Sequence, residues 1–192
     1  MDPAMEQITA NVYSNTKIRG SNPSFVTTSD GVVVIDTPQL PTRAVAMRAE
    51  AESHGPIRYL INTEHHVDHT FGNYYFRGAG IVVNHQGLYD NFMTVAPILD
   101  PFAYAEEAIP TDDPDGAAIF PDRDTYYEDP NKGQLVFTGD LIIRVGETTF
   151  RCLHTPGHTP GQLAVHLPEE GVVFTGDTIF NECQTWLMWS DI

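Results

Sequence analysis

The chain has 192 residues, of which 41% are hydrophobic and 10% aromatic, so it can bury a core of ordinary domain size. Acidic residues outnumber basic residues by 26 to 10, which gives a formal net charge of −16. This charge argues against binding to nucleic acid or to an anionic membrane surface, because both require basic patches. Its two cysteines make no disulfide framework, and the first residues resemble no secretory signal. We expect a cytoplasmic protein.

Strands and helices alternate in the first third of the chain. A buried strand is predicted at 31–36, where four apolar β-branched residues follow a Ser29-Asp30-Gly31 turn. A helix is predicted over 42–53, since apolar residues recur there at helical spacing and Pro41 can stand first. In chain order, the predictions are strands at 8–16, 24–28 and 31–36, a helix at 42–53, a strand at 57–62, a short helix at 70–76 and a strand at 80–84.

The middle of the chain differs in composition from both flanks. Residues 100–130 contain ten acidic residues and a single basic one, Arg123, and repeated prolines exclude a long helix. Aromatic residues are interleaved with these charges, which favours a folded collar against a neighbouring surface over disorder. We therefore divide one single domain, 1–192, into a first half at about 1–99, an acidic proline-rich collar at about 100–133 and a partial second half at about 134–192.

The last third is rich in predicted strands. Like the first half, it places polar side chains with ligating groups directly after buried strands, where open sheets build their sites. The final residues, 184–192, are apolar and aromatic and have no polar tail, so we expect that a covering segment is missing. The predictions here are consecutive antiparallel strands at 135–138, 140–145 and 148–154, then a hairpin formed by 162–167 and 171–175.

The densest group of ligating side chains is Glu64-His65-His66-Val67-Asp68-His69, directly after the predicted strand at 57–62. Side chains two residues apart in an extended segment point the same way, so Glu64 and His66 can converge on one metal ion. Asp68 and His69 lie in the turn that follows and can address a second ion. Carboxylates and neutral imidazoles are ligands for zinc, iron and manganese. The cluster therefore predicts a metal site.

Two further segments present polar side chains after strands. In His154-Thr155-Pro156-Gly157-His158-Thr159-Pro160-Gly161, prolines and glycines form a tight loop that presents His158. In Val173-Phe174-Thr175-Gly176-Asp177-Thr178, a buried strand leads to Asp177 through a glycine. Each segment alone fits an ordinary turn equally well.

The order of these three segments resembles the metallo-β-lactamase superfamily. The resemblance extends over residues 8–183 and includes the strand that ends in Asp36 and Thr37. It implies an α/β (α+β) fold, a four-layer αββα sandwich with its second half incomplete, and a site for one or two metal ions between the sheets at one edge.

The resemblance also implies a ligand set. The family's usual His-x-His-x-Asp-His motif begins here with a glutamate, Glu64. Zinc is the expected divalent metal, and the extra carboxylate makes manganese or iron an alternative. By this resemblance the first ion is held by Glu64, His66 and His158, and the second by Asp68 and His69, with Asp177 bridging both and Asp36 orienting a ligand or loop.

The chemistry implied is metal-dependent hydrolysis. A metal-bound hydroxide, oriented by the catalytic residue Asp68, is expected to open a carbonyl-type bond in a lactam, lactone, ester or thioester. Two alternatives stay open: an iron-dependent redox protein on the same fold, and a fragment with impaired catalysis that binds metal. The expected partner is a small-molecule substrate, with neither nucleic acid nor membrane, and either a homo-oligomer or a C-terminal segment can complete the fold.

Overall fold

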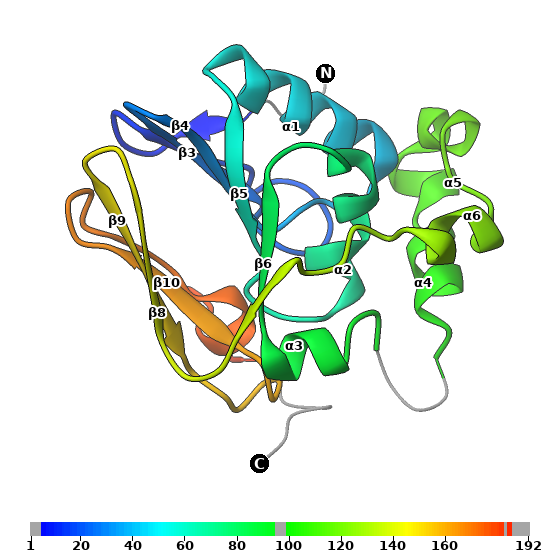
Figure 1. Cartoon of the computed structure of the whole chain (residues 1–192). Helices are drawn as coiled ribbons and strands as arrows, with labels where there is room; N and C mark the ends of the chain where they lie inside the picture. The colour runs from blue at the N-terminus through cyan, green and yellow to red at the C-terminus, as the bar shows by residue number, and fades with distance from the viewer. Residues whose placement is uncertain (1–4, 95–98, 183, 186–192) are drawn as a thin grey trace.

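The computed structural model of the chain describes residues 5–94, 99–182 and 184–185. Two β-sheets lie face to face, and helices gather on the outer side of the larger sheet (Figure 1). In the larger sheet β1 to β4 pair antiparallel and β4 to β7 pair parallel. The strands of this sheet, in spatial order, are β1 (Glu6–Gln7), β2 (Val12–Ser14), β3 (Ser24–Thr28), β4 (Gly31–Ile35), β5 (Ile57–Ile61), β6 (Ile81–His85) and β7 (Leu135–Phe137).

The smaller sheet is antiparallel throughout and lies against one face of the larger sheet (Figure 1). The main core lies between the two sheets. On the outer face of the smaller sheet, Ile142 and Val173 are exposed. Its strands, in spatial order, are β11 (Val172–Phe174), β10 (Leu163–Leu167), β9 (Thr148–His154) and β8 (Leu141–Val145).

Alternation along β4 explains why the larger sheet is covered on both faces. Val33 and Ile35 belong to the core between the sheets, whereas Val32 and Val34 pack on the other side with helix α1 (Pro41–Ser53). Side chains alternate across a strand, so an unbroken apolar run is typical of a strand buried on both faces. The predicted buried strand at 31–36 and the predicted helix at 42–53 are confirmed.

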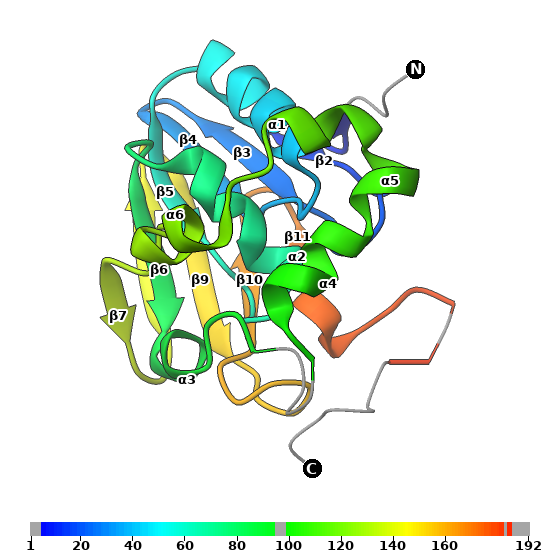
Figure 2. The same cartoon turned by 90° about the vertical axis from the view of Figure 1, so that its right-hand side faces the viewer.

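The collar is folded, as predicted. Its helices are short because prolines interrupt them, and they lie together beside α1 and α2 (Val67–Thr70) (Figure 2). Tyr126 and Phe102 are buried against Phe71, with a stacked Tyr126–Phe71 centroid distance of 4.6 Å. The helices after α2 are η1 (Phe71–Phe76), α3 (Gln86–Asp90), α4 (Pro101–Glu107), α5 (Ile109–Asp112), η2 (Pro114–Ala118), α6 (Arg123–Glu128) and η3 (Gly176–Thr178).

Two strand predictions are wrong. The strand predicted at 8–16 is reduced to β2 at 12–14, and β1 lies before the predicted range. Between these two strands Thr9 Oγ1 accepts hydrogen bonds from the backbone of Asn11 and Val12 and closes a turn. The strand predicted at 135–138 does not begin the antiparallel series. It is β7, which pairs parallel with β6 in the larger sheet, because the intervening helices carry the chain back across that sheet.

Residues 186–192, in the segment expected to need a cover, lie outside the described residues. Among the helices that the structure describes, none has both the length and the apolar character needed to cross a membrane.

Candidate metal centre

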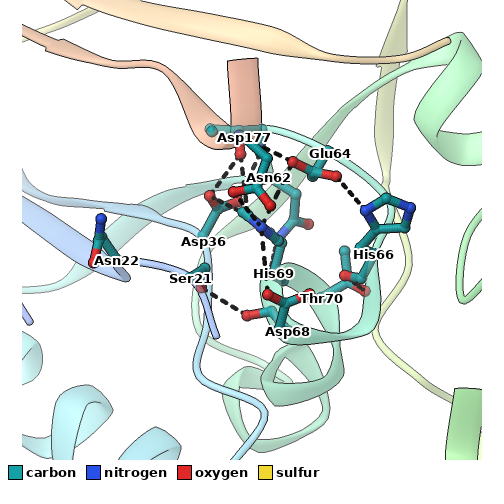
Figure 3. Close-up of polar contacts among 12 residues, drawn as sticks. Ser21, Asn22, Asp36, Asn62, Glu64, His66, Asp68, His69, Thr70 and Asp177 are labelled. Atoms are coloured by element: carbon teal, nitrogen blue, oxygen red, sulfur yellow. Dashed lines mark hydrogen bonds and ion pairs between the residues drawn. The ribbon is translucent and has the colours of Figure 1, made fainter. Parts of the chain in front are cut away.

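Four segments that follow strands of the two sheets meet at one edge of the molecule. Asp36 directly follows β4, and the segment from Asn62 to His69 follows β5. His158 lies in the loop between β9 and β10, and Asp177 lies in η3 after β11. Glu64, His69 and Asp177 point toward one another in the close-up (Figure 3). The strands thus deliver polar groups from both halves of the chain to one place.

A first group of potential ligands contains Glu64, His66 and His158, whose ligating atoms lie within 4.8 Å of one another. Glu64 Oε2 lies 2.6 Å from His66 Nδ1 and 3.3 Å from His158 Nε2. Glu64 is fully buried, and His158 is 4% exposed. The structure therefore brings together the three residues predicted for the first metal ion.

A second group contains Glu64, His69 and Asp177. His69 Nε2 lies 3.6 Å from Glu64 Oε1 and 3.4 Å from Asp177 Oδ1. Asp68 Oδ2 lies 3.7 Å from the same nitrogen but is not part of this group. Asp177 Oδ2 also lies 3.8 Å from His158 Nε2, so its carboxylate faces both groups. The structure places all six predicted ligands together, and the residue common to both groups is Glu64.

The ring of His69 is held on its other side by Asp36. Asp36 Oδ2 lies 2.9 Å from His69 Nδ1, while the backbone nitrogen and hydroxyl of Thr63 donate to the same carboxylate at 2.7 Å and 2.6 Å. Asp36 adopts a left-handed backbone conformation, with φ of 56°. A carboxylate behind a ligating imidazole is a common arrangement at metal sites, because it fixes the ring and its tautomer.

The surroundings of the buried Nε2 atom of His69 indicate whether these residues fit a metal ion. Because Nδ1 faces Asp36, a neutral His69 carries its hydrogen there and directs the Nε2 lone pair toward Glu64, Asp68 and Asp177. Within the described part of the chain this Nε2 atom has no hydrogen-bond partner. A lone pair among three carboxylates is unfavourable unless a cation lies between them. The donor set therefore fits a divalent metal ion.

Electrostatics in the metal-free protein follow from the same packing. Burial lowers the pKa of His69, but the charges of Glu64, Asp36 and Asp68 outweigh it and hold that pKa well above the usual value. Burial raises the pKa of Glu64, but the charge of His69 and hydrogen bonds from His158 and His66 hold it well below the usual value. Desolvation, with the charges of Asp177 and Glu64, raises the pKa of Asp68 against the opposing charge of His69.

The sequence did not identify the Gly20–Ser21 segment, which lies next to the centre. Ser21 Oγ donates to the backbone oxygen of Asp68 at 2.6 Å, and a Cβ at Gly20 would lie 2.7 Å from the Asp68 Cβ. His65 is not in either ligand group, and burial, helped by the charge of His66, lowers its pKa to about 3. Polar residues in the loop between two predicted strands were the only signal for the Gly20–Ser21 segment.

A cavity of about 310 Å³ adjoins the centre. Asp36, His69 and Asp177 line it, together with apolar side chains such as Val12 and Val172 from the facing edges of the two sheets. The cavity is large enough for a small organic ligand.

Close backbone packing holds the loop that carries His158. A Cβ added at Gly161 would overlap the backbone nitrogen of Leu88 in α3. We expect Gly161→Ala to lower the free energy of unfolding by about 1–3 kcal/mol, because neither backbone can yield cheaply. Denaturant unfolding of the metal-free protein measures this, with Glu128→Ala, at an exposed position in α6, as the control. Equal stability of the two variants would contradict the packing argument.

Known proteins resemble this chain in sequence. A model described as the metallo-beta-lactamase superfamily matches residues 17–190. A hydroxyacylglutathione hydrolase of Maricaulis maris is 28% identical over 153 residues, covering 79% of this chain and 44% of that protein. An atrochrysone carboxyl ACP thioesterase of Claviceps purpurea is 40% identical over 68 residues, covering 34% of this chain and 22% of that protein. The chain thus spans less than half the length of either relative.

Solved structures share the fold. A metallo-beta-lactamase from Pontibacter korlensis superposes with a TM-score of 0.62 at 17% identity, covering 90% of this chain and 70% of that one. A B3 metallo-beta-lactamase described as having an active site glutamic acid superposes with a TM-score of 0.57 at 20% identity, covering 87% of this chain and 57% of that one.

Proposed function

This chain belongs to the metallo-beta-lactamase superfamily, and from that premise we propose that it is a metal-dependent hydrolase acting on thioesters. The observation that carries the proposal is the pair of ligand groups around the buried carboxylate of Glu64. A fully buried carboxylate beside three histidines and two further carboxylates is costly unless cations neutralise it. We propose Glu64, His66 and His158 as ligands of one ion, and Glu64, His69 and Asp177 as ligands of a second, with Asp68 beside it.

A divalent metal ion held by these residues would polarise the carbonyl group of a substrate and lower the pKa of a bound water molecule. The protein's own residues do the rest. Asp36 holds the His69 ring so that Nε2 faces the carboxylates. Asp68 lies beside the second group, and desolvation raises its pKa above that of an ordinary aspartate, so it keeps a proton to a higher pH.

The substrate class follows from two considerations. Both relatives described above have names that denote hydrolysis of acyl groups attached to a carrier, glutathione in one case and ACP in the other. Within the described residues, the cavity beside the centre is lined by apolar and uncharged polar side chains together with Asp36, His69 and Asp177, and it includes neither lysine nor arginine. We therefore propose a thioester with an uncharged acyl group, because apolar side chains such as Val12 and Val172 line the cavity and none of its lining residues is a lysine or arginine that could pair with a carboxylate.

A substrate panel tests this function. The full chain is loaded separately with Zn²⁺, Mn²⁺ or Fe²⁺ and given uncharged acyl thioesters, matched thioesters with a terminal carboxylate, lactones and a lactam. We expect the largest kcat/KM for uncharged thioesters with one of the three metals. Loss of turnover in chelator and its return on adding that metal are the controls. A protein that binds metal and hydrolyses none of these substrates would overturn the proposal.

The carboxylate of Glu64 also favours a second candidate, an iron-dependent redox protein. Carboxylate and imidazole together suit iron, and Glu64 contributes to both groups. Metal analysis after expression without added metal separates the candidates. Stoichiometric iron with a visible absorption band, in a protein without hydrolytic activity, would favour redox chemistry, whereas zinc would favour the hydrolase.

A further inference from the structure

We propose that Thr37, Asn62 and Asn73 form a buried hydrogen-bond network that positions His69 for metal binding. The inference rests on the metal-binding part of the proposed function. None of the three residues belongs to either ligand group, and all are fully buried. Buried polar side chains are retained at a cost unless their hydrogen bonds are satisfied, so the partners of this network indicate what it holds in place.

The network converges on the backbone oxygen of His69. The Thr37 backbone nitrogen donates to this oxygen at 3.0 Å, and the Asn62 side-chain amide donates to it at 2.9 Å. The Thr37 hydroxyl lies within hydrogen-bond distance of the same oxygen, at 3.2 Å. Two N–H donors on one carbonyl oxygen, with the Thr37 hydroxyl beside them, leave the backbone of His69 little freedom to shift or rotate.

The two asparagines hold one another in turn. Asn73 Nδ2 donates to Asn62 Oδ1 at 2.8 Å, and Asn62 Nδ2 donates to Asn73 Oδ1 at 3.1 Å. The Thr37 hydroxyl also donates to Asn73 Oδ1, at 2.9 Å. Because the amide pair is reciprocal, neither side chain can rotate without breaking at least two hydrogen bonds.

The outer members of the network come from other parts of the chain. Asn84, at the end of β6, donates to Asn62 Oδ1 at 3.1 Å. Asn131, in the last residues of the collar, donates to the backbone oxygen of Asn73 at 2.9 Å. The polar pair is thereby tied to a neighbouring parallel strand and to the collar, which makes it a rigid support.

The backbone and the ring of His69 are therefore fixed from the same point. Asp36 holds the ring at Nδ1, and Thr37, the next residue, holds the backbone oxygen. With both ends fixed, Nε2 is directed at Glu64 and Asp177. Partners behind metal ligands typically alter metal affinity about 10–100-fold when they are removed, because the ligand loses its orientation.

Substitutions at Thr37 separate positioning from packing. Thr37→Val keeps the shape and removes the hydroxyl, whereas Thr37→Ser keeps the hydroxyl and removes a methyl group. Zinc is titrated into the metal-free full chain by calorimetry, and Tm is measured for each metal-free variant. We expect Thr37→Val to weaken one of the two zinc affinities about 10-fold or more. Thr37→Ser should retain that affinity within about twofold while lowering Tm, because it leaves a small cavity.

The control is Thr27→Val, at a threonine in β3 whose hydroxyl contacts Asn11 and none of the network. If Thr37→Val does not fold, Asn62→Ser tests the same idea by removing the amide donor to the His69 oxygen. Zinc affinities that are unchanged in these variants, or that fall equally in Thr37→Val and Thr37→Ser, would overturn the positioning role and leave the proposed function standing. A wild-type chain that binds no zinc would overturn both.

Discussion

A Glu64→Gln variant is expected to lose metal from both ligand groups and, with it, hydrolytic activity. In the wild type, the two carboxylate oxygens of Glu64 face different groups. Oε2 faces His66 and His158, and Oε1 faces His69. A neutral amide is a poor metal ligand and removes the negative charge that the neighbouring histidines face. We expect each zinc affinity to fall by more than about 100-fold, since loss of an outer partner alone costs about 10–100-fold.

Calorimetric titration and metal analysis of the purified variant measure this effect. Glu128→Gln, at an exposed position in α6, is the matched control and should bind zinc like the wild type. Asp177→Ala sharpens the test, because it should weaken the second group and leave the Glu64, His66 and His158 group able to bind one ion. Retention of one zinc ion by Glu64→Gln at wild-type affinity would show that Glu64 does not serve both groups.

Metal affinity is expected to rise with pH by about tenfold per pH unit across the neutral range, as it does when one proton competes with the metal. That proton is on His69, whose pKa in the metal-free protein is held well above the usual value by the surrounding carboxylates. The pKa of Glu64 is held well below the usual value, so its carboxylate is already ionised there and releases no proton. Zinc titrations in two buffers with different protonation enthalpies measure the release.

Stability of the metal-free protein should change with pH in the opposite sense. A group whose pKa is raised on folding stabilises the fold below its unfolded-state pKa, and this contribution disappears as pH rises through the folded pKa. For His69, the Tm of the metal-free protein should therefore fall as pH rises above the usual histidine range, while the Tm increase produced by zinc grows. Heat of binding that does not depend on the buffer would contradict the assignment of the proton to His69.

Apolar periodicity in the sequence was sufficient to predict individual strands and helices. The apolar run before Asp36 predicts a buried strand because side chains alternate along it, and the spacing of Ala44, Met47 and Ala51 predicts α1. The partner of β7 could not be predicted in this way, because parallel pairing with β6 depends on the path of the intervening helices. Periodicity identifies a strand and not its neighbour.

In the candidate site, too, the sequence predicts which residues take part but not how they are arranged. The six ligands predicted from three short segments of sequence lie together in the structure, although Asp68 belongs to neither ligand group. That Glu64 is common to both groups could not be foreseen, because it depends on where each carboxylate oxygen points. The network of Thr37, Asn62 and Asn73 was also missed, since its hydrogen bonds join residues from separate elements and no short motif marks them.

The segment between β6 and β7, which contains α3 and the collar, begins and ends on adjacent strands, because β7 pairs directly with β6. The collar is therefore part of an insertion between two neighbouring strands of the sheet. Replacing the helices of the collar with a shorter or longer segment need not separate the strands, provided that the Asn131–Asn73 hydrogen bond at the end of the collar is kept. Variation in the collar would change the surface over α2 and η1, where Phe102 and Tyr126 pack on Phe71, while the strands that deliver the ligands stay in register.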